Sequence, residues 1–317
     1  MNLPHLRQLL LSSQSLMMVE EVLRSQLMQC LAPISSPSLT PAAFFFDDPE
    51  TYAQESSKAF KELMASLKTG MDKDLPPVTM DYTSAEVPDG SIAYHRIAGT
   101  ITFDSRWYFS TRRFEQDLLA AEQNPAIIAH LLHINSGGGE AYYLDRLSET
   151  MRSLTKPVVV LIEQYCASAA YYIGCHSSHI YALTANDTIG CVGTMVHVEN
   201  WDGFYEKNGI KQFVIKSSLS PLKNKMYDDV MDGKPNEYIE RVLDPLAAQF
   251  IAEVRSSRKA LSGLSDDDRL LQGDTFQTAQ AIERGIIDGT MTLSEALRQA
   301  QTLGLSTRKA NSFALSL

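Results

Sequence analysis

Ser168 is the side chain of this sequence best placed for nucleophilic chemistry. It lies in the segment QYCASAAYY (Gln164–Tyr172), between Ala167 and Ala169, directly after an apolar run that is typical of a buried strand. Small neighbours let another polypeptide approach the hydroxyl closely. At a turn between a strand and a helix, this serine would offer its hydroxyl and the following backbone N–H groups to a peptide carbonyl. Ser168 is therefore our candidate for acyl transfer.

A glycine-rich turn is the second segment that could do chemistry. The sequence HINSGGGEA places Gly137, Gly138 and Gly139 after a predicted strand ending at Ile134. Glycines reach backbone conformations with positive φ, so neighbouring amides can point together toward an anion. The lysine of a P-loop and the spacing of a dinucleotide-binding turn are missing, so a pair of oxyanion-binding amides fits better than a phosphate site. A purely structural turn is the alternative.

Alternating strand and helix patterns must position these two segments. Strands are predicted at 92–97, 100–103, 127–134, 158–162 and 180–183, and helices at 111–123, 141–154 and 168–174. This alternation is typical of an α/β fold with a parallel sheet and right-handed crossovers. Ligands in such sheets gather beyond the carboxyl ends of the strands. We therefore expect the glycine turn and Ser168 to converge, although they are far apart in sequence.

Composition excludes several function classes. The chain has 317 residues and a net charge of -10, which argues against nucleic acid as a partner because phosphate binding requires a basic surface. Its four cysteines form no CxxC cluster, so neither a zinc site nor a disulfide framework is predicted. No apolar run approaches the roughly 20 residues of a membrane span, and the N-terminus lacks the features of a signal peptide. A cytoplasmic protein is expected.

The chain divides into three predicted parts. Residues 1–90 form a helical N-terminal extension with a proline- and serine-rich linker, in which Phe44–Phe46 are interpreted as a hydrophobic anchor or a partner-docking site. Residues 91–300 form the main domain, which includes a predicted helix at 238–259. Residues 301–317 are rich in serine and threonine and are expected to be a mobile tail.

Two stretches together resemble a known family. HINSGGGEAYYLDRLSETM and KPVVVLIEQYCASAAYYIGCHSSHIYALTANDTIGCVGT are similar to the signal peptide peptidase A (SppA) family of serine peptidases, which are relatives of ClpP. LQGDTFQTAQAIERGIIDGTMTLSEAL matches the closing segment of that family, so the similarity runs from about Ile92 to about Leu297. The resemblance implies a ClpP/crotonase-like parallel sheet with crossover helices, and a Ser/Lys dyad that hydrolyses peptide bonds without a cofactor.

The resemblance assigns Ser168 as the nucleophile and a downstream lysine as the general base. A lysine accepts a proton only when it is neutral, so its pKa must fall well below about 10.4. We choose Lys223, because the S-x-x-K-N form of SPLKN resembles single-domain family members. Lys225 is the second candidate and Lys216 the third. The spacing between the family's serine and lysine motifs is stretched in this chain.

The resemblance also implies supporting groups. The backbone amides of Gly138 and Ala169 are the expected oxyanion donors. Cys191, in TIGCVGT, replaces a family serine that hydrogen-bonds the catalytic lysine, and a thiol is a weaker hydrogen-bonding group. Thr194 or Thr188 could take that role instead.

Three alternatives stay open at this point. Gly137, which stands where the family has proline, and Cys191 are compatible with an assembly or scaffold protein that has lost activity. A Ser/His arrangement would use His133 or His197. An acyl-CoA hydratase relative would share the oxyanion architecture and would need Glu140 as its acid or base.

The expected partners follow from the family. Its members form rings, and in some the lysine comes from a neighbouring subunit, so a homo-oligomer that acts on polypeptides is predicted. The substrates would be signal-peptide remnants or, for a bacteriophage or prophage protein, scaffold and capsid proteins. The unmatched helical N-terminus and the lack of a predicted anchor favour the second role, capsid maturation.

Overall fold

The computed structural model describes residues 51–69 and 74–314. Within these ranges nine strands form one sheet, with the central order β1-β2-β4-β5-β6-β9. All neighbouring strands are parallel except β7 and β8. The strands are β1 Val78–Thr79, β2 Ser91–Thr102, β3 Phe109–Ser110, β4 Ile127–Gly139, β5 Val158–Ala167, β6 His179–Ala182, β7 Thr188–Gly190, β8 Thr275–Gln277 and β9 Gly289–Thr290. The predicted α/β class with a parallel sheet and crossover helices is confirmed.

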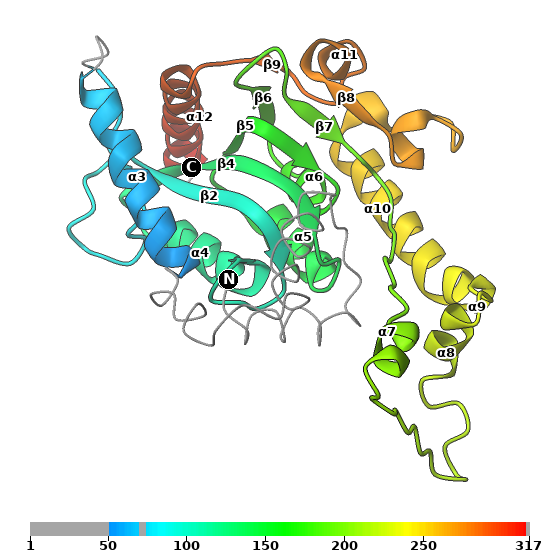
Figure 1. Ribbon diagram of the computed structural model, residues 1–317. Helices are drawn as coiled ribbons and strands as arrows, with labels where there is room; N and C mark the ends of the chain where they lie inside the picture. The colour runs from blue at the N-terminus through cyan, green and yellow to red at the C-terminus, as the bar shows by residue number, and fades with distance from the viewer. Residues whose placement is uncertain (1–50, 70–73, 315–317) are drawn as a thin grey trace.

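Helices cover both faces of the sheet (Figure 1). They are α3 Tyr52–Thr69, α4 Thr111–Gln123, α5 Leu144–Ser153, α6 Ala169–Gly174, α7 Asp202–Lys207, α8 Lys225–Met231, α9 Asn236–Tyr238, π-helix η4 Ile239–Leu243, α10 Asp244–Ser257, 3₁₀ helices η5 Lys259–Leu261 and η6 Arg269–Gln272, α11 Thr278–Glu283 and α12 Leu293–Ala314.

Two apolar layers form the core. On one face, Leu118 of α4, Leu147 of α5 and Phe250 of α10 belong to one buried cluster. On the other, Phe60 of α3 and Leu297 of α12 pack in a second. Because both faces are covered, the central strands are buried at successive rather than alternate positions, over 127–134 in β4 and 158–162 in β5. This is why their sequences predicted buried strands so clearly.

The packed structure starts earlier than the predicted boundary at residue 91. The hydroxyl of Tyr52 donates to the carbonyl of Arg96 at 2.6 Å, and the rings of Phe60 and Tyr94 lie 5.2 Å apart. β1 also pairs with β2. Since β2 presents apolar side chains on both faces, it needs a cover on the side away from α4, and α3 provides it.

Residues 301–314, where the sequence suggested a mobile tail, continue α12. Leu303 packs against the apolar layer that α3 and α12 share. At Gly304 the helix backbone comes so close to β4 that an added Cβ would lie 2.6 Å from the carbonyl oxygen of Ile128. Only glycine allows this approach. The serines and threonines that suggested a tail occupy the other side of a docked helix.

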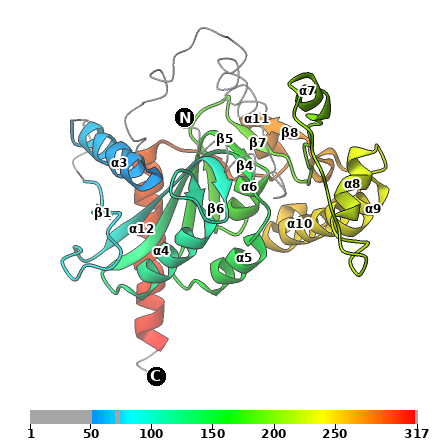
Figure 2. The same ribbon diagram turned by 60° about the horizontal axis from the view of Figure 1, so that its bottom comes forward.

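A long excursion between β7 and α9 extends away from the sheet (Figure 1 and Figure 2). We call residues 195–235, which include α7 and α8, the arm. Large apolar side chains of the arm face solvent, and five of them are at least 75% exposed: Phe213, Val214, Ile215, Leu219 and Leu222. In the described ranges, none of the helices combines the length and apolarity that crossing a membrane requires.

Candidate active site

Ser168 forms the turn between β5 and α6. Its backbone dihedrals are φ 57° and ψ -126°, outside the regions that residues with a side chain normally occupy. The turn is held from both sides: the N–H of Ser168 donates to the carbonyl of Gly190 at 2.8 Å, and its carbonyl accepts from the N–H of Tyr172 at 2.9 Å. Backbone strain of this kind is maintained where the surroundings fix it, and it is concentrated at functional sites.

The glycine turn lies directly against this serine. Gly138 has a φ of +110°, and a Cβ added to it would lie 2.8 Å from the Cβ of Ser168 and 3.0 Å from the backbone nitrogen of Ala169. No side chain fits there. The predicted convergence of the two segments is therefore confirmed, and it follows from their positions at the carboxyl ends of the adjacent strands β4 and β5.

Strand β2 fixes the rest of the glycine turn. A Cβ on Gly139 would lie 2.0 Å from the carbonyl oxygen of Ile101, so the two backbones touch. The N–H of Glu140 donates to that same carbonyl at 2.9 Å, and its carboxylate accepts from the N–H of Phe103 at 2.7 Å. Glu140 therefore ties the turn to β2, which is a structural use of the carboxylate that an acyl-CoA hydratase would need for acid–base chemistry.

One expected oxyanion donor is hydrogen-bonded within the turn. The N–H of Gly138 donates to the hydroxyl of Ser136 at 3.1 Å, and that hydroxyl donates to the carbonyl of Gly99 at 2.6 Å. An oxyanion beside Ala169 would have to replace Ser136 as the acceptor. The exchange is favourable, because a charged oxygen accepts a stronger hydrogen bond than a hydroxyl does.

Cys191 and Thr194 follow β7, which runs beside the serine turn. Gly190 pairs with Ala167, and the N–H of Cys191 donates to the carbonyl of Asp274 at 2.8 Å. Cys191 is half-buried, with a φ of 56°. Thr194 instead donates its hydroxyl to the carbonyl of Leu243 at 2.9 Å, which links it to the start of α10.

The three candidate lysines all lie on the arm. Lys223 is exposed, Lys216 pairs with Asp228, and Lys225 pairs with Asp229. The hydrogen bond that Lys225 donates to Asp229 raises the pKa of the lysine, which is the opposite of what a general base needs. Within one chain, Ser168 thus lies next to the backbone of the predicted oxyanion donors. The arm, which carries the candidate lysines, extends away from the sheet (Figure 1 and Figure 2).

His133, the alternative base, is engaged elsewhere. Its Nδ1 lies 2.7 Å from the hydroxyl of Tyr94, and its Nε2 lies 3.2 Å from the carboxylate of Glu163. The hydrogen bond with His133 lowers the pKa of Glu163. These partners lie toward the α3 face of the sheet, where the ring of Phe60 packs on Tyr94.

The two cysteines flanking the serine segment are buried thiols. Burial raises the pKa of Cys166 well above its usual range and that of Cys175 to about 12. Both remain protonated at neutral pH, so neither can act as a thiolate nucleophile. Among the described residues, no group of three or more histidine, cysteine or acidic side chains is arranged to hold a metal ion.

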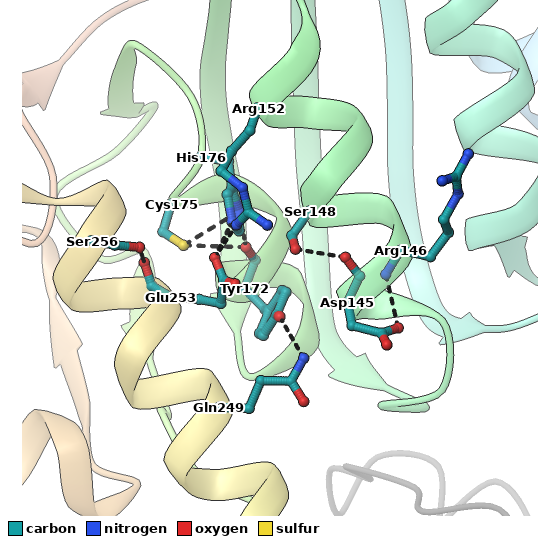
Figure 3. Close-up of polar contacts among 10 residues, drawn as sticks. All are labelled: Asp145, Arg146, Ser148, Arg152, Tyr172, Cys175, His176, Gln249, Glu253 and Ser256. Atoms are coloured by element: carbon teal, nitrogen blue, oxygen red, sulfur yellow. Dashed lines mark hydrogen bonds and ion pairs between the residues drawn. The ribbon is translucent and has the colours of Figure 1, made fainter.

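A pocket of about 350 Å³ lies between α10 and the segments that follow the glycine turn, the serine turn and β7. It is lined by Ala141, Tyr142, Tyr143, Leu144, Asp145, Arg146, Tyr172, Thr194, Leu246, Gln249 and Phe250. Tyr172 lies one helical turn after Ser168, and Gln249 of α10 donates to its hydroxyl at 3.4 Å (Figure 3). Burial raises the pKa of Tyr172 to about 12, so the phenol stays neutral. Sequence reasoning missed this pocket, since its α10 wall comes from a distant segment.

A polar cluster fixes α10 against α6. The carboxylate of Glu253 lies 3.0 Å from Nε2 of His176 and also pairs with Arg152 of α5 (Figure 3). Nδ1 of His176 lies 2.8 Å from the carbonyl of Tyr172. The cluster therefore holds the α10 wall of the pocket in place.

Residues 150–305 match the family model described as Peptidase family S49. Over this region the chain is similar to the peptidases of that family. The matched region takes in Ser168, the arm and α10, and the glycine turn precedes it.

Curated relatives agree with this match at low identity. The chain is 27% identical over 191 residues to an Enterococcus faecium protein named for signal peptide peptidase SppA, covering 58% of this chain and 53% of that protein. It is 24% identical over 196 residues to Protease 4 of Haemophilus influenzae (59% and 30% covered) and 28% identical over 182 residues to the chloroplastic serine protease SPPA of Arabidopsis thaliana (55% and 25% covered). The chain thus spans about half, or less, of the length of these relatives.

Solved structures with a similar fold include peptidases and hydratases. A membrane-bound stomatin-specific protease superposes with a TM-score of 0.44 at 15% identity, covering 66% of this chain and 83% of that one. ClpP1 of Listeria monocytogenes gives 0.41 at 15% identity (64% and 94% covered). An enoyl-CoA hydratase from Polaromonas sp. JS666 gives 0.37 at 17% identity (62% and 67% covered). The neighbours are of ClpP/crotonase type.

Proposed function

We propose that this chain is a serine peptidase in which Ser168 is the nucleophile and Lys223 the general base. The observation that supports it most directly is the contact between Gly138 and the serine turn, which brings the backbones of Gly138 and Ala169, the expected oxyanion donors, together beside Ser168. The Peptidase family S49 match and the protease names of the relatives favour peptide-bond hydrolysis over other acyl transfers.

The proposed reaction proceeds in two steps. Neutral Lys223 takes the proton of Ser168 while the oxygen attacks the substrate carbonyl carbon, and the resulting oxyanion displaces Ser136 from the amide of Gly138. The lysine then protonates the departing amine as the C–N bond breaks. Water hydrolyses the ester on Ser168 by the same proton route, which regenerates the enzyme.

A second copy of the chain is the proposed source of the lysine. The arm carries Lys223 away from its own sheet and exposes Phe213, Ile215 and Leu219, an apolar surface that a lone chain leaves in water. Exposed patches of this kind mark interaction sites. Packing this surface on a neighbouring copy would complete both sites in a homo-oligomeric ring, which favours Lys223 over the paired Lys225.

The pocket defines the proposed substrate class. Aromatic side chains of Tyr142, Tyr172 and Phe250 line it, so we expect an extended polypeptide that places a large apolar side chain there. Signal-peptide remnants and scaffold or capsid segments both supply such side chains.

Cys191 favours a second candidate function, that of an assembly protein without activity. Its thiol would offer the catalytic lysine a weaker hydrogen-bonding partner than a hydroxyl does.

Fluorophosphonate labelling followed by intact mass spectrometry tests the proposal. We expect the wild type to gain one label on Ser168 and to digest an unfolded casein. In Ser168→Ala and in Lys223→Ala, the rates of labelling and of casein digestion should each fall by at least about 10³-fold. Removing either member of a pair that acts as a unit abolishes the function of both. Lys225→Ala, a matched arm lysine, should retain both rates. Digestion by Ser168→Ala at the wild-type rate would disprove the proposal, and a folded wild type that neither labels nor digests would favour the assembly protein.

A further inference from the structure

The described chain begins beside the pocket. The N–H of Tyr52, at the start of α3, donates to the carbonyl of Arg106 at 2.9 Å. Arg106 belongs to the loop that follows β2, and in the same loop the ring of Phe103 packs on the rings of Tyr142 and Tyr143, with centroids 4.9 and 5.1 Å away. Both tyrosines line the pocket. The first residues of α3 therefore lie against the loop whose Phe103 contacts the pocket wall.

The sequence immediately before this point has the chemistry of a ligand for the pocket. Phe44–Phe46 are three consecutive aromatic residues, followed by Asp47 and Asp48, and all of them lie outside the described residues. Aromatic side chains suit the aromatic wall of the pocket. Asp47 and Asp48 add negative charge after the aromatic run, and Arg146, one of the residues that line the pocket, already pairs with Glu115.

The length of the intervening peptide is sufficient. Fully extended, the chain from Phe46 to Tyr52 spans about 20 Å, and from Phe44 about 27 Å. The route across the fold is shorter: about 10 Å along the loop from Arg106 to Phe103, then the 4.9 Å ring contact to Tyr142. The three phenylalanines can thus reach the pocket without any rearrangement of α3.

We propose that Phe44–Phe46 of this chain bind in the pocket and that the peptide bond after one of them is cleaved at Ser168. This inference rests on the proposed peptidase activity. The oxygen of Ser168 bonds to the phenylalanine carbonyl carbon, the C–N bond to the next residue breaks, and the new amine takes the proton held by the base. Water then hydrolyses the ester, which frees an N-terminal fragment that ends in phenylalanine and leaves Ser168 unchanged.

Intact mass spectrometry of the full-length protein, together with hydrolysis of a fluorogenic peptide with phenylalanine before the reporter, tests this inference. We expect the wild type to lose a fragment ending at residue 44, 45 or 46, while Ser168→Ala keeps its full mass. A variant with Phe44, Phe45 and Phe46 all changed to serine should also keep its full mass, yet hydrolyse the free peptide at least as fast as wild type. Phe313→Ser, another exposed aromatic residue, should be processed like wild type.

These measurements distinguish self-cleavage from the proposed peptidase activity. A wild type that hydrolyses the peptide but keeps its N-terminus, or is cut elsewhere, overturns self-cleavage and leaves the peptidase proposal standing. Processing of the triple variant at the wild-type rate also overturns it. If the wild type neither hydrolyses the peptide nor reacts with fluorophosphonate at Ser168, the peptidase proposal fails and self-cleavage fails with it. Circular dichroism confirms that each variant is folded.

Discussion

Gly138 and Ser168 are so close that a Cβ on the glycine would lie 2.8 Å from the Cβ of the serine. Two segments separated by a whole strand–helix crossover thus meet at one point at the edge of the sheet. The contact does two things. It requires glycine at position 138, where φ is +110°, and it places a backbone amide next to the nucleophile candidate. An enzyme that forms an oxyanion at Ser168 depends on both.

Gly138→Ala should abolish most activity while the protein stays folded. The new Cβ collides with the serine turn and removes the amide from its position, and loss of one oxyanion donor costs about 10²–10³-fold in kcat. Steady-state kinetics on the fluorogenic peptide measure this. Gly90→Ala is the matched control, because Gly90 also has a positive φ, +81°, but has open space around its Cβ position. It should lower the free energy of unfolding by about 1 kcal/mol with unchanged kcat.

The convergence of these two segments could be predicted because local patterns determine it. Apolar runs ending at Ile134 and Ile162 indicated two buried parallel strands, and parallel strands present their carboxyl ends at the same edge. The strands continue past those runs, to Gly139 and Ala167, because polar and small residues remain in the ladder there. Sequence periodicity does not detect that continuation.

The pocket and the arm could not be predicted in the same way. Phe250 forms a pocket wall because α10 packs on α6, through the contact of its ring with Tyr172 and the pairing of Glu253 with His176, and these are tertiary contacts between distant segments. The arm has apolar residues, such as Phe213 and Ile215, in an irregular segment without helical or strand periodicity. Neither feature has a local pattern. The sequence therefore could not predict where Lys223 lies relative to Ser168.

Tyr142→Ala should change substrate preference with little effect on stability. Its ring is 66% exposed but contributes to the pocket wall, so removing it deletes contact area for a bound apolar side chain rather than core packing. For a peptide with phenylalanine at the pocket position, we expect KM to rise about 10-fold, while a peptide with alanine there is nearly unaffected. An equal loss for both peptides would show that this pocket does not receive the substrate side chain. Phe313→Ala serves as an exposed aromatic control.

Mixing two inactive variants should restore activity if the arm lysine acts between copies. Ser168→Ala keeps Lys223, and Lys223→Ala keeps Ser168, so a mixed assembly contains some sites with both groups. We expect up to roughly a quarter of wild-type activity after subunits exchange, from random pairing in an assembly held by nearest-neighbour contacts. Continued inactivity of a mixture shown by native mass spectrometry to contain both variants would place the lysine and serine of each site on one chain.

Disrupting the exposed apolar surface of the arm should separate the copies. Ile215→Asp puts a charge on a side chain that is 93% exposed in the single chain, so it leaves the fold intact but opposes burial against a neighbour. Sedimentation velocity should show a shift from the assembly toward single chains, with loss of peptide hydrolysis. Lys207→Asp, which adds an acidic group to the polar surface of α7, is the control. An Ile215→Asp protein that remains assembled would contradict the proposed role of the arm.

Acid sensitivity should come from a buried pair of histidines under α4. Nε2 of His95 lies 3.1 Å from Nδ1 of His130, and burial lowers the pKa of both rings, that of His95 well below 6.5. Below pH 6.5 the unfolded chain binds protons that the folded chain excludes, so stability is fully present above that pH and falls as the solution is acidified. The free energy of unfolding should decrease by about 1.4 kcal/mol per pH unit for each histidine.

His95→Phe should reduce the pH dependence of the free energy of unfolding by the contribution of one histidine. Urea unfolding between pH 7 and pH 5 should then show a slope that is smaller by about 1.4 kcal/mol per pH unit, even though the variant is less stable overall. Burial raises the pKa of Asp117 to about 6, which acts in the opposite direction, but Asp117 is present in both proteins and cancels in the difference. Tyr82→Phe is the matched control: its ring stacks on His95, and burial keeps its pKa far above this range, so its slope should equal that of wild type. An unchanged slope in His95→Phe would mean that His95 binds its proton equally in the folded and unfolded chains.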